Sequence, residues 1–373
     1  MWGPVVLGLA ACPLGKGTNG GGGEPAAGAP RIVVAERAPS GGSRLVVVAE
    51  NGDRMSELVI AADEQAVDTN PAFSPDGAWV VFASSRDREF GKMSLWIVRA
   101  RARSTPIRLT TGEAVDMTPA WTRDGTAIVF ASTREGSFDL WRVPVTFDGD
   151  AVTAGEPERL TELPGQELSP AIAADGRIAF TSIEDAGGVQ HARIGLRATN
   201  GKVSFLTAGP ADTGPAWTRE GDAVAFTAPH LRPPEDGGDP AVDADLFLVP
   251  AKGGSATLLV DAPGTDETAP AFSEDGRWLF ATSVFRSVSD GRPLTSSVVH
   301  VDRWEKTPMV RMLVDHVGPV PRLAVTVAPV VLDATTLHAA PVYKDALGDI
   351  LRRAIEEGSA PGDGGDGDGG DDQ

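Results

Sequence analysis

The chain has 373 residues, of which 41% are hydrophobic, and its formal net charge at pH 7 is −19. This length and apolar content suffice for a large buried core, and closed all-β folds of this size often form a single domain. An acidic surface repels phosphate backbones, so the charge argues against nucleic acid as a partner. The single cysteine, Cys12, excludes an intrachain disulfide.

Residues 5–11 form a short apolar run that ends in small residues directly before Cys12. Such a run is typical of a secretory signal and is too short to span a membrane, which takes about 20 apolar residues. Leu9-Ala10-Ala11-Cys12 resembles the lipobox of bacterial lipoproteins, in which the chain is cut before a cysteine that then carries a diacylglycerol. The resemblance implies lipidation of Cys12 and membrane anchoring in the cell envelope, facing the periplasm or the cell surface. The alternative is an apolar stub with a lone buried cysteine, and no Lys or Arg precedes the run, which leaves open a true start upstream of Met1.

A short motif recurs five times in the middle of the chain. Each copy reads Pro-Ala, then an aromatic residue or Ile, two variable residues, and Asp-Gly or Glu-Gly. The copies begin at Pro71, Pro119, Pro170, Pro215 and Pro270. They follow one another at about 45 to 55 residues, a period that suits one four-stranded blade of a β-propeller.

Each repeat predicts four antiparallel strands. The Pro-Ala-aromatic run is the first strand, and Asp-Gly makes a hairpin turn because Gly readily takes a positive φ. A second strand with an aromatic residue follows, as in residues 79–82, and a third contains a Leu-Trp or Leu-Phe pair, as in residues 95–98. A more polar fourth strand, such as residues 107–110, ends the unit. One such sheet cannot bury both of its faces, so neighbouring sheets must stack.

The repeat resembles the blade repeat of the TolB-type propellers, which also occurs in the propellers of prolyl oligopeptidase relatives. The resemblance rests on the Pro-x-aromatic-Ser-x-Asp-Gly run, the aromatic about ten residues later, the Ser-x-Arg loop and the Leu-Trp strand. It covers residues 31–330 and implies an all-β, six-bladed β-propeller in the cell envelope. It also implies a peptidoglycan-associated or outer-membrane lipoprotein as partner. TolB carries an α/β domain ahead of its propeller, and none is visible here, so a true TolB role does not follow.

The remaining blade is expected to combine the two ends of the domain. Residues 31–60 hold three strand-like runs without a leading Pro-x-aromatic strand, and residues 321–327 hold one more. Adding that run to the other three closes the ring and removes exposed sheet edges. We therefore expect six blades, and a seven-bladed ring that uses residues 328–343 is the alternative.

Beyond the repeats, apolar residues recur at helical spacing in residues 342–357, which predicts a short amphipathic helix outside the ring. The last residues alternate Gly and Asp and are expected to be disordered. The expected organisation is a lipoprotein-type signal over 1–12, a Gly-rich tether over 13–30, the propeller over 31–330, an extension with the helix over 331–357 and the disordered acidic tail over 358–373.

An acid stands three residues before each motif proline. These candidate binding residues are Asp68, Asp116, Glu167, Asp212 and Glu267. The chain passes there from the outer strand of one blade to the inner strand of the next, so a ring is expected to place all five at one mouth of its channel. We favour a structural role, in which each carboxylate accepts backbone N–H bonds or pairs with an arginine such as Arg86 or Arg134. The functional alternative is an acidic funnel that binds a cation, a basic peptide or a metal.

The sequence contains no familiar catalytic or cofactor motif. Its histidines are scattered without metal-ligand spacing, and neither Gly-x-Ser-x-Gly nor Gly-x-x-x-x-Gly-Lys occurs. We therefore expect no enzyme activity, no metal and no cofactor, and instead a monomeric, non-catalytic lipoprotein whose propeller binds an envelope protein or peptide. The alternatives are a metal-dependent polysaccharide lyase or hydrolase with its site in the channel, and a structural surface protein without a specific ligand.

Overall fold

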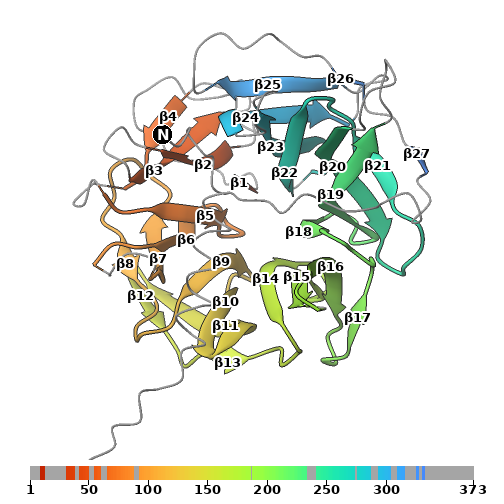
Figure 1. The fold of residues 1–373 in the computed structure, drawn as a ribbon. Coiled ribbons are helices and arrows are strands. Elements are labelled where there is room, and N and C mark those ends of the chain that lie inside the picture. The colour runs from red at the N-terminus through yellow and green to blue at the C-terminus, as the bar shows by residue number, and fades with distance from the viewer. Residues whose placement is uncertain are drawn as a thin grey trace, which may run out of the picture.

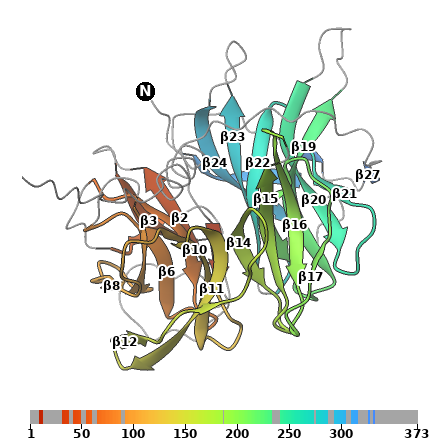
Figure 2. The ribbon, with the colours of Figure 1, turned by 60° about the horizontal axis from the view of Figure 1, so that its bottom comes forward.

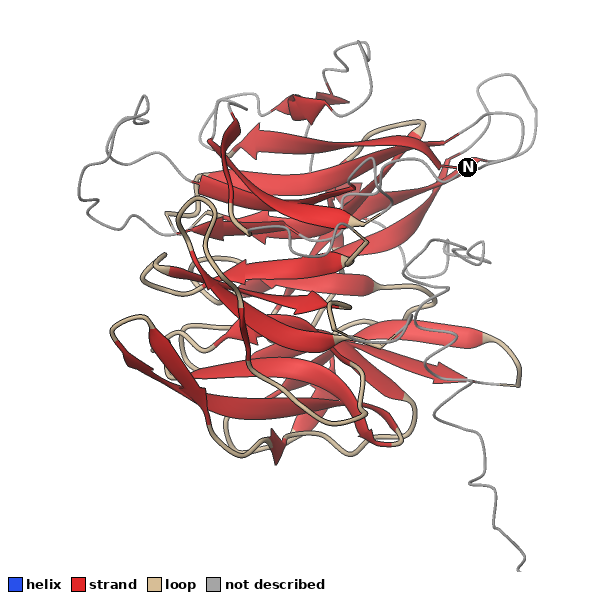
Figure 3. Ribbon diagram, turned by 90° about the vertical axis from the view of Figure 1, so that its left-hand side faces the viewer, coloured by secondary structure: helices blue, strands red, loops and turns tan. Residues whose placement is uncertain are grey.

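The computed structural model arranges the chain as six antiparallel sheets around a central channel (Figure 1). It describes residues 9–12, 31–37, 42–49, 54–59, 65–87, 92–185, 187–232, 241–273, 275–286, 293–303, 309–315, 325–326 and 330–331. These residues form strands and loops but no helix (Figure 3), and therefore none that is long and apolar enough to cross a membrane. The predicted all-β, six-bladed β-propeller is confirmed, and the seven-bladed alternative is wrong.

The blades follow one another along the chain, and in each the strands run from the channel outward. The inner strands are β1 (Leu9–Cys12), β5 (Asp68–Phe73), β9 (Asp116–Trp121), β14 (Gln166–Ile172), β18 (Thr213–Trp217) and β22 (Thr265–Phe272). The second strands are β2 (Arg31–Arg37), β6 (Trp79–Ser84), β10 (Ala127–Glu135), β15 (Ile178–Asp185), β19 (Ala223–Arg232) and β23 (Trp278–Arg286). The third strands are β3 (Ser43–Ala49), β7 (Ser94–Arg99), β11 (Ser137–Asp148), β16 (Gln190–Arg197), β20 (Ala241–Pro250) and β24 (Pro293–Asp302). The outer strands are β4 (Arg54–Glu57), β8 (Ile107–Arg108), β13 (Glu158–Arg159), β17 (Val203–Phe205), β21 (Thr257–Val260) and β25 (Met309–Asp315).

The predicted repeat forms the second to sixth blades. Gly77 and the glycines of the four equivalent turns have φ between 67° and 87°, the left-handed conformation that the hairpin between the inner and second strands requires. The second strand of each of these five blades carries a buried phenylalanine at its centre. These are Phe82, Phe130, Phe180, Phe226 and Phe280. Burial of each such side chain contributes about 1.5–3 kcal/mol. These side chains pack with residues of the neighbouring blades, so the core lies between stacked sheets.

Indole groups add hydrogen bonds between neighbouring blades. Trp121 donates from Nε1 to the carbonyl of Ala72 at 3.1 Å, and Trp217 donates in the same way to the carbonyl of Ala171 at 3.0 Å. In each case the acceptor is the motif alanine of the preceding blade. The Pro-Ala-Trp form of the motif therefore links successive inner strands as well as forming one.

The first blade is closed by N-terminal residues alone. β1 pairs with β2, with Leu9 opposite Val34 and Cys12 opposite Arg31. Residues 325–326 (β26), within the run expected to complete this blade, instead pair with β25 at the outer edge of the sixth blade. Residues 330–331 (β27), which the seven-bladed alternative used, pair with β21 of the fifth blade. The expected closure by both chain ends is wrong, because the position beside β2 is already taken by β1.

The segment with lipobox resemblance thus coincides with β1, and cleavage before Cys12 and its lipidation stay predictions. The predicted tether (13–30), helix (342–357) and acidic tail (358–373) lie outside the described residues. They stay predictions as well.

A hairpin of β11 and β12 (Ala151–Ala154) extends from the edge of the ring (Figure 2). Phe147 on β11 lies over Trp79 and Trp121, with ring centroids 5.2 and 6.2 Å apart. Asp150 in the turn accepts a hydrogen bond from Arg99 at 2.8 Å. The hairpin therefore fastens the third blade to the second.

We expect deletion of residues 1–12 to destabilise the ring, because it removes β1 and leaves the inner edge of β2 unpaired. The matched control is deletion of residues 1–8, which keeps β1. Chemical denaturation followed by tryptophan fluorescence compares the free energies of unfolding, and we expect them to differ by more than about 1 kcal/mol. Equal stability of the two proteins contradicts the assignment of β1 to the first blade.

Candidate functional site

The five acids singled out by the sequence lie near the start of the inner strands. Their side chains are all buried, with exposed fractions of 0 to 3%, and none of them lines the central cavity. The structure therefore distributes them among the junctions between blades. Each has to be neutralised in a place with little water, and two different solutions occur.

The first solution is an arginine at the end of the second strand or just after it. Asp68 accepts hydrogen bonds from Arg86 at 2.6 and 2.5 Å and from the Ser84 hydroxyl at 2.6 Å. Asp116 accepts one from Arg134 at 2.9 Å. The guanidinium of Arg134 also lies 4.9 Å from the ring centroid of Trp141, and such stacking supports a desolvated arginine. Pairing of these acids with Arg86 and Arg134 agrees with the structural role favoured from the sequence.

The second solution is protonation of the buried carboxylate itself. Burial, together with the nearby Asp139 carboxylate, raises the pKa of Glu167 to about 8. Neither carboxylate oxygen of Glu167 has a hydrogen-bond partner among the described residues. Burial also raises the pKa of Asp139. Its Oδ2 atom accepts a hydrogen bond from Arg159 at 2.8 Å. Glu167 therefore favours its protonated form at pH 7.

Glu267 repeats this arrangement in the sixth blade. One of its oxygens accepts hydrogen bonds from Thr265 and Ser283, both at 2.7 Å. Burial, with the carboxylates of Asp245 and Asp266 nearby, raises its pKa to about 8. Asp212 is intermediate, since burial raises its pKa to about 6 and Gly209 donates a backbone N–H to it at 3.1 Å. A ligand-binding role for the five acids stays a prediction.

A cavity of about 340 Å³ lies in the middle of the ring, walled by β5, β9, β14, β18 and β22. The motif prolines and alanines make up much of its wall. The residues before the prolines also line it, and each has a left-handed backbone. Their φ values are 49° for Asn70, 49° for Thr118, 50° for Ser169, 62° for Gly214 and 52° for Ala269.

The pairing register of every one of these inner strands shifts at this point, so a β-bulge precedes each proline. A positive φ is uncommon outside glycine and is strained for a β-branched residue such as Thr118. Repeated strain of this kind marks a position that the surrounding structure holds in place, and it often lies at a functional site. The bulge brings the polar side chains of Asn70, Thr118 and Ser169 to the cavity wall.

Two arginines, Arg123 and Arg219, complete the lining together with Trp217 and Phe272. Neither arginine was predicted from the sequence. The sequence did contain a hint of them. In two of the five motifs an arginine stands directly before the Asp-Gly or Glu-Gly pair, where other motifs have Pro75 or Ala174.

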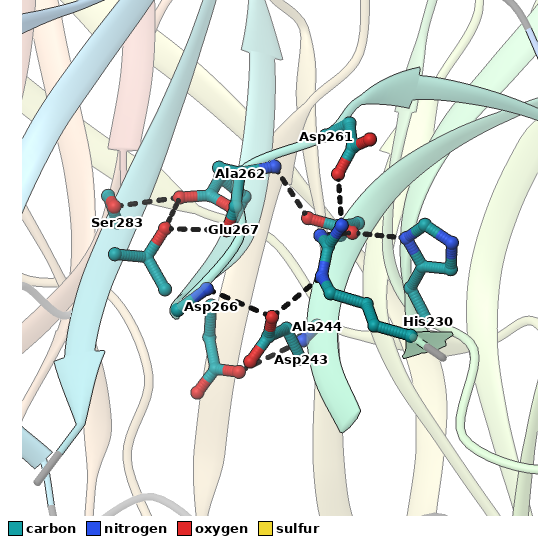
Figure 4. Close-up of polar contacts among 12 residues, drawn as sticks. His230, Asp243, Ala244, Asp261, Ala262, Asp266, Glu267 and Ser283 are labelled. Carbon is teal, nitrogen blue, oxygen red and sulfur yellow. Dashed lines mark hydrogen bonds and ion pairs between the residues drawn. The ribbon is translucent and has the colours of Figure 1, made fainter. Parts of the chain in front are cut away.

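A third group of residues, on the fifth blade, has ligands of the kind that metals take (Figure 4). His230, Asp245 and Asp261 each offer one ligand atom, and these atoms lie within 4.8 Å of one another. His230 Nδ1 is 2.6 Å from Asp245. Arg232 already forms ion pairs with Asp245 and Asp261, and with Asp243 at 2.8 Å, so a metal ion there has to compete with its guanidinium. The sequence did not predict this group, because its members lie on β19, on β20 and in the segment after β21 and come together only in the folded blade.

We expect Glu167→Gln to flatten the pH dependence of stability. The folded pKa of Glu167 is about 8, against an ordinary 4.5, so the folded state holds a proton that the unfolded state loses between these values. The stability from this proton is fully present below about pH 4.5 and is lost as the pH rises towards 8. The free energy of unfolding of the wild type should therefore fall relative to the variant by up to about 1.4 kcal/mol per pH unit in this window.

Denaturant titrations at intervals from about pH 5 to about pH 8 measure this difference. The control is Glu162→Gln, at a side chain that is 84% exposed. A constant difference between wild type and Glu167→Gln across the range contradicts a neutral Glu167.

We expect Arg86→Met to cost about 3–5 kcal/mol, because it removes a guanidinium that pairs with the buried Asp68 carboxylate at 2.5 Å. Lys92→Met is the matched control, since Lys92 pairs with a Glu113 side chain that is 88% exposed and exposed pairs contribute about 0–1 kcal/mol. Thermal and chemical unfolding measure both. Similar losses in the two variants contradict the importance of the buried pair.

Comparison with known proteins gives a family and a fold. Residues 43–232 match the family model of the TolB beta propeller domain. A similar solved structure is that of a protein from Agrobacterium tumefaciens assigned as a TolB, with 18% identity and a TM-score of 0.51, covering 75% of this chain and 86% of that one. Others are an oligogalacturonate lyase in complex with manganese (15% identity, TM-score 0.39, covering 65% and 73%) and a Mycobacterium tuberculosis puromycin-hydrolysing peptidase (15%, 0.48, 79% and 44%). No curated protein matches the sequence.

The expectation that this chain is not an enzyme was inferred from the blade repeat and the lack of familiar motifs, and it is wrong. Propellers similar to it belong to a lyase and to a peptidase, so the blade repeat and the lack of familiar motifs do not exclude catalysis. At these identities the likeness to solved structures concerns the fold alone. The family model spans just over half of the chain, and the chain therefore belongs to the TolB beta propeller domain family.

Proposed function

We propose that the protein is a binding propeller of the cell envelope, whose central cavity takes up part of a protein or peptide ligand. The observation that carries the proposal is the cavity of about 340 Å³. Small-ligand pockets commonly measure about 300–1,000 Å³ and combine apolar walls with a few placed polar groups. Here the motif prolines and alanines supply the apolar wall, and the bulged residues supply polar groups.

The rigidity of the wall supports this proposal. Five inner strands carry the same bulge at the same place, and indole hydrogen bonds tie two pairs of them together. A wall that is ordered before the ligand arrives loses little conformational freedom on binding, which favours affinity. The location in the envelope and an outer-membrane lipoprotein as partner are parts of the same proposal. Anchoring through Cys12 is not, because cleavage before Cys12 removes three of the four residues of β1.

A metal-dependent lyase or hydrolase reaction in the channel is less well supported. Among the described residues that line the cavity there is no histidine, aspartate or glutamate. The group around His230 lies elsewhere on the fifth blade, and Arg232 neutralises it in part.

We expect the double variant Ala171→Phe, Ala271→Phe to lose ligand capture, because both alanines are half-buried and line the cavity. Ala151→Phe, at an exposed position on β12, is the matched control. The measurement is capture from a detergent-solubilised envelope fraction of the cells that make the protein, with the bound proteins identified by mass. Capture of the same protein by the double variant contradicts binding in the cavity, provided that circular dichroism shows all variants to be folded.

A further inference from the structure

The charge of the cavity is opposite to that of the protein. The chain has 52 acidic residues against 33 Lys and Arg. The described residues that line the cavity nevertheless include Arg123 and Arg219 and no acidic side chain. Positive charge is therefore concentrated at this cavity.

Both arginines are available to a ligand. Arg123 is exposed and makes no hydrogen bond or ion pair with any other described residue. Arg219 is also exposed, and its guanidinium makes one long hydrogen bond, 3.3 Å, to the carbonyl of Asp275. That contact orients Arg219 without neutralising it. A planar guanidinium with several donors suits a carboxylate, which it can bind through two parallel hydrogen bonds.

The acids of the neighbouring turns do not compete for these arginines in the structure. The Asp124 carboxylate accepts hydrogen bonds from Thr122 at 2.7 Å and from the Thr126 backbone at 3.0 Å, and these hold its pKa below the usual range. Asp175 pairs with Arg177 at 2.7 Å. These carboxylates stabilise their own hairpins and are not part of the cavity wall.

The wall beside Arg219 is aromatic. Trp217 and Phe272 are half-buried and line the cavity. Each has an arginine near its ring, with Arg177 4.7 Å from the Trp217 ring and Arg303 5.0 Å from the Phe272 ring. The aromatic groups are therefore fixed and offer the cavity an apolar contact next to a cation.

The size of the cavity limits its occupant. At about 340 Å³ it is at the lower end of ligand pockets. A helix with its side chains is about 10–12 Å across and is too wide for such a space. An extended chain end fits better, and capture of a terminal carboxylate is one of the ways in which proteins recognise peptides.

We propose that the cavity recognises the C-terminal carboxylate of an extended peptide. Arg123 and Arg219 bind the carboxylate, and Trp217 with Phe272 contacts an apolar side chain near the peptide end. This inference rests on the proposed peptide-binding function of the same cavity and adds the chemistry of its ligand.

The test uses two fluorescein-labelled pools of random pentapeptides on the full-length protein, one pool with free C-terminal carboxylates and the other with C-terminal amides. Retained peptides are identified by mass, and the strongest binders are titrated by fluorescence anisotropy. We expect at least about tenfold tighter binding of the free acid than of the matched amide, the size expected for a hydrogen bond to a charged group. Arg123→Gln and Arg219→Gln should each reduce that preference about tenfold.

The control variant is Arg103→Gln, because Arg103 is an exposed residue in the loop between β7 and β8 on the outer part of the second blade. It should leave binding unchanged. Equal affinity for acids and amides, unaltered by Arg123→Gln, overturns the carboxylate inference and leaves channel binding standing. Binding of neither pool overturns the inference, and capture from the envelope fraction then decides the proposed function separately. Arg123-dependent binding of a uronic acid trisaccharide in place of the peptides also overturns it.

Discussion

The buried carboxylates at the junctions between blades are the constraint on which this ring depends. Five of the six inner strands begin next to such a group, and an isolated charge in a dry interior is too costly to keep. Where the end of the second strand or the residues just after it provide Arg134 or Arg86, the acid is an aspartate and forms an ion pair. Where the equivalent residue is Glu184 or Phe285, the acid is a glutamate that keeps its proton.

This constraint also determines what the channel is made of. Because the acids face the junctions, the cavity wall is left to prolines, alanines and the bulged residues before each proline. The bulge needs a left-handed backbone, and five consecutive blades share it. The repeat, which the sequence explains by packing alone, thus also shapes the central cavity.

The sequence predicted those features that each repeat carries within itself. The period of the motif predicted the blades, Asp-Gly predicted the hairpins, and the acid with Arg86 or Arg134 predicted the ion pairs. Features that depend on contacts between distant residues were not predictable in this way. The pairing of β1 with β2 joins residues separated by a long Gly-rich stretch, and Asn70, Thr118 and Ala269 share no residue type that signals a bulge. The arginines of the cavity had a signal, but only the folded ring shows that Arg123 and Arg219 face the same space.

The central claim is that ligands bind inside the ring and not on its outer edges. The most direct measurement is photo-crosslinking in the producing cells, with a benzophenone amino acid at Ala174, an exposed residue that lines the cavity, or at Thr153, an exposed residue on β12. We predict a discrete crosslinked partner from position 174 and none from position 153. A partner crosslinked from position 153 alone contradicts this claim.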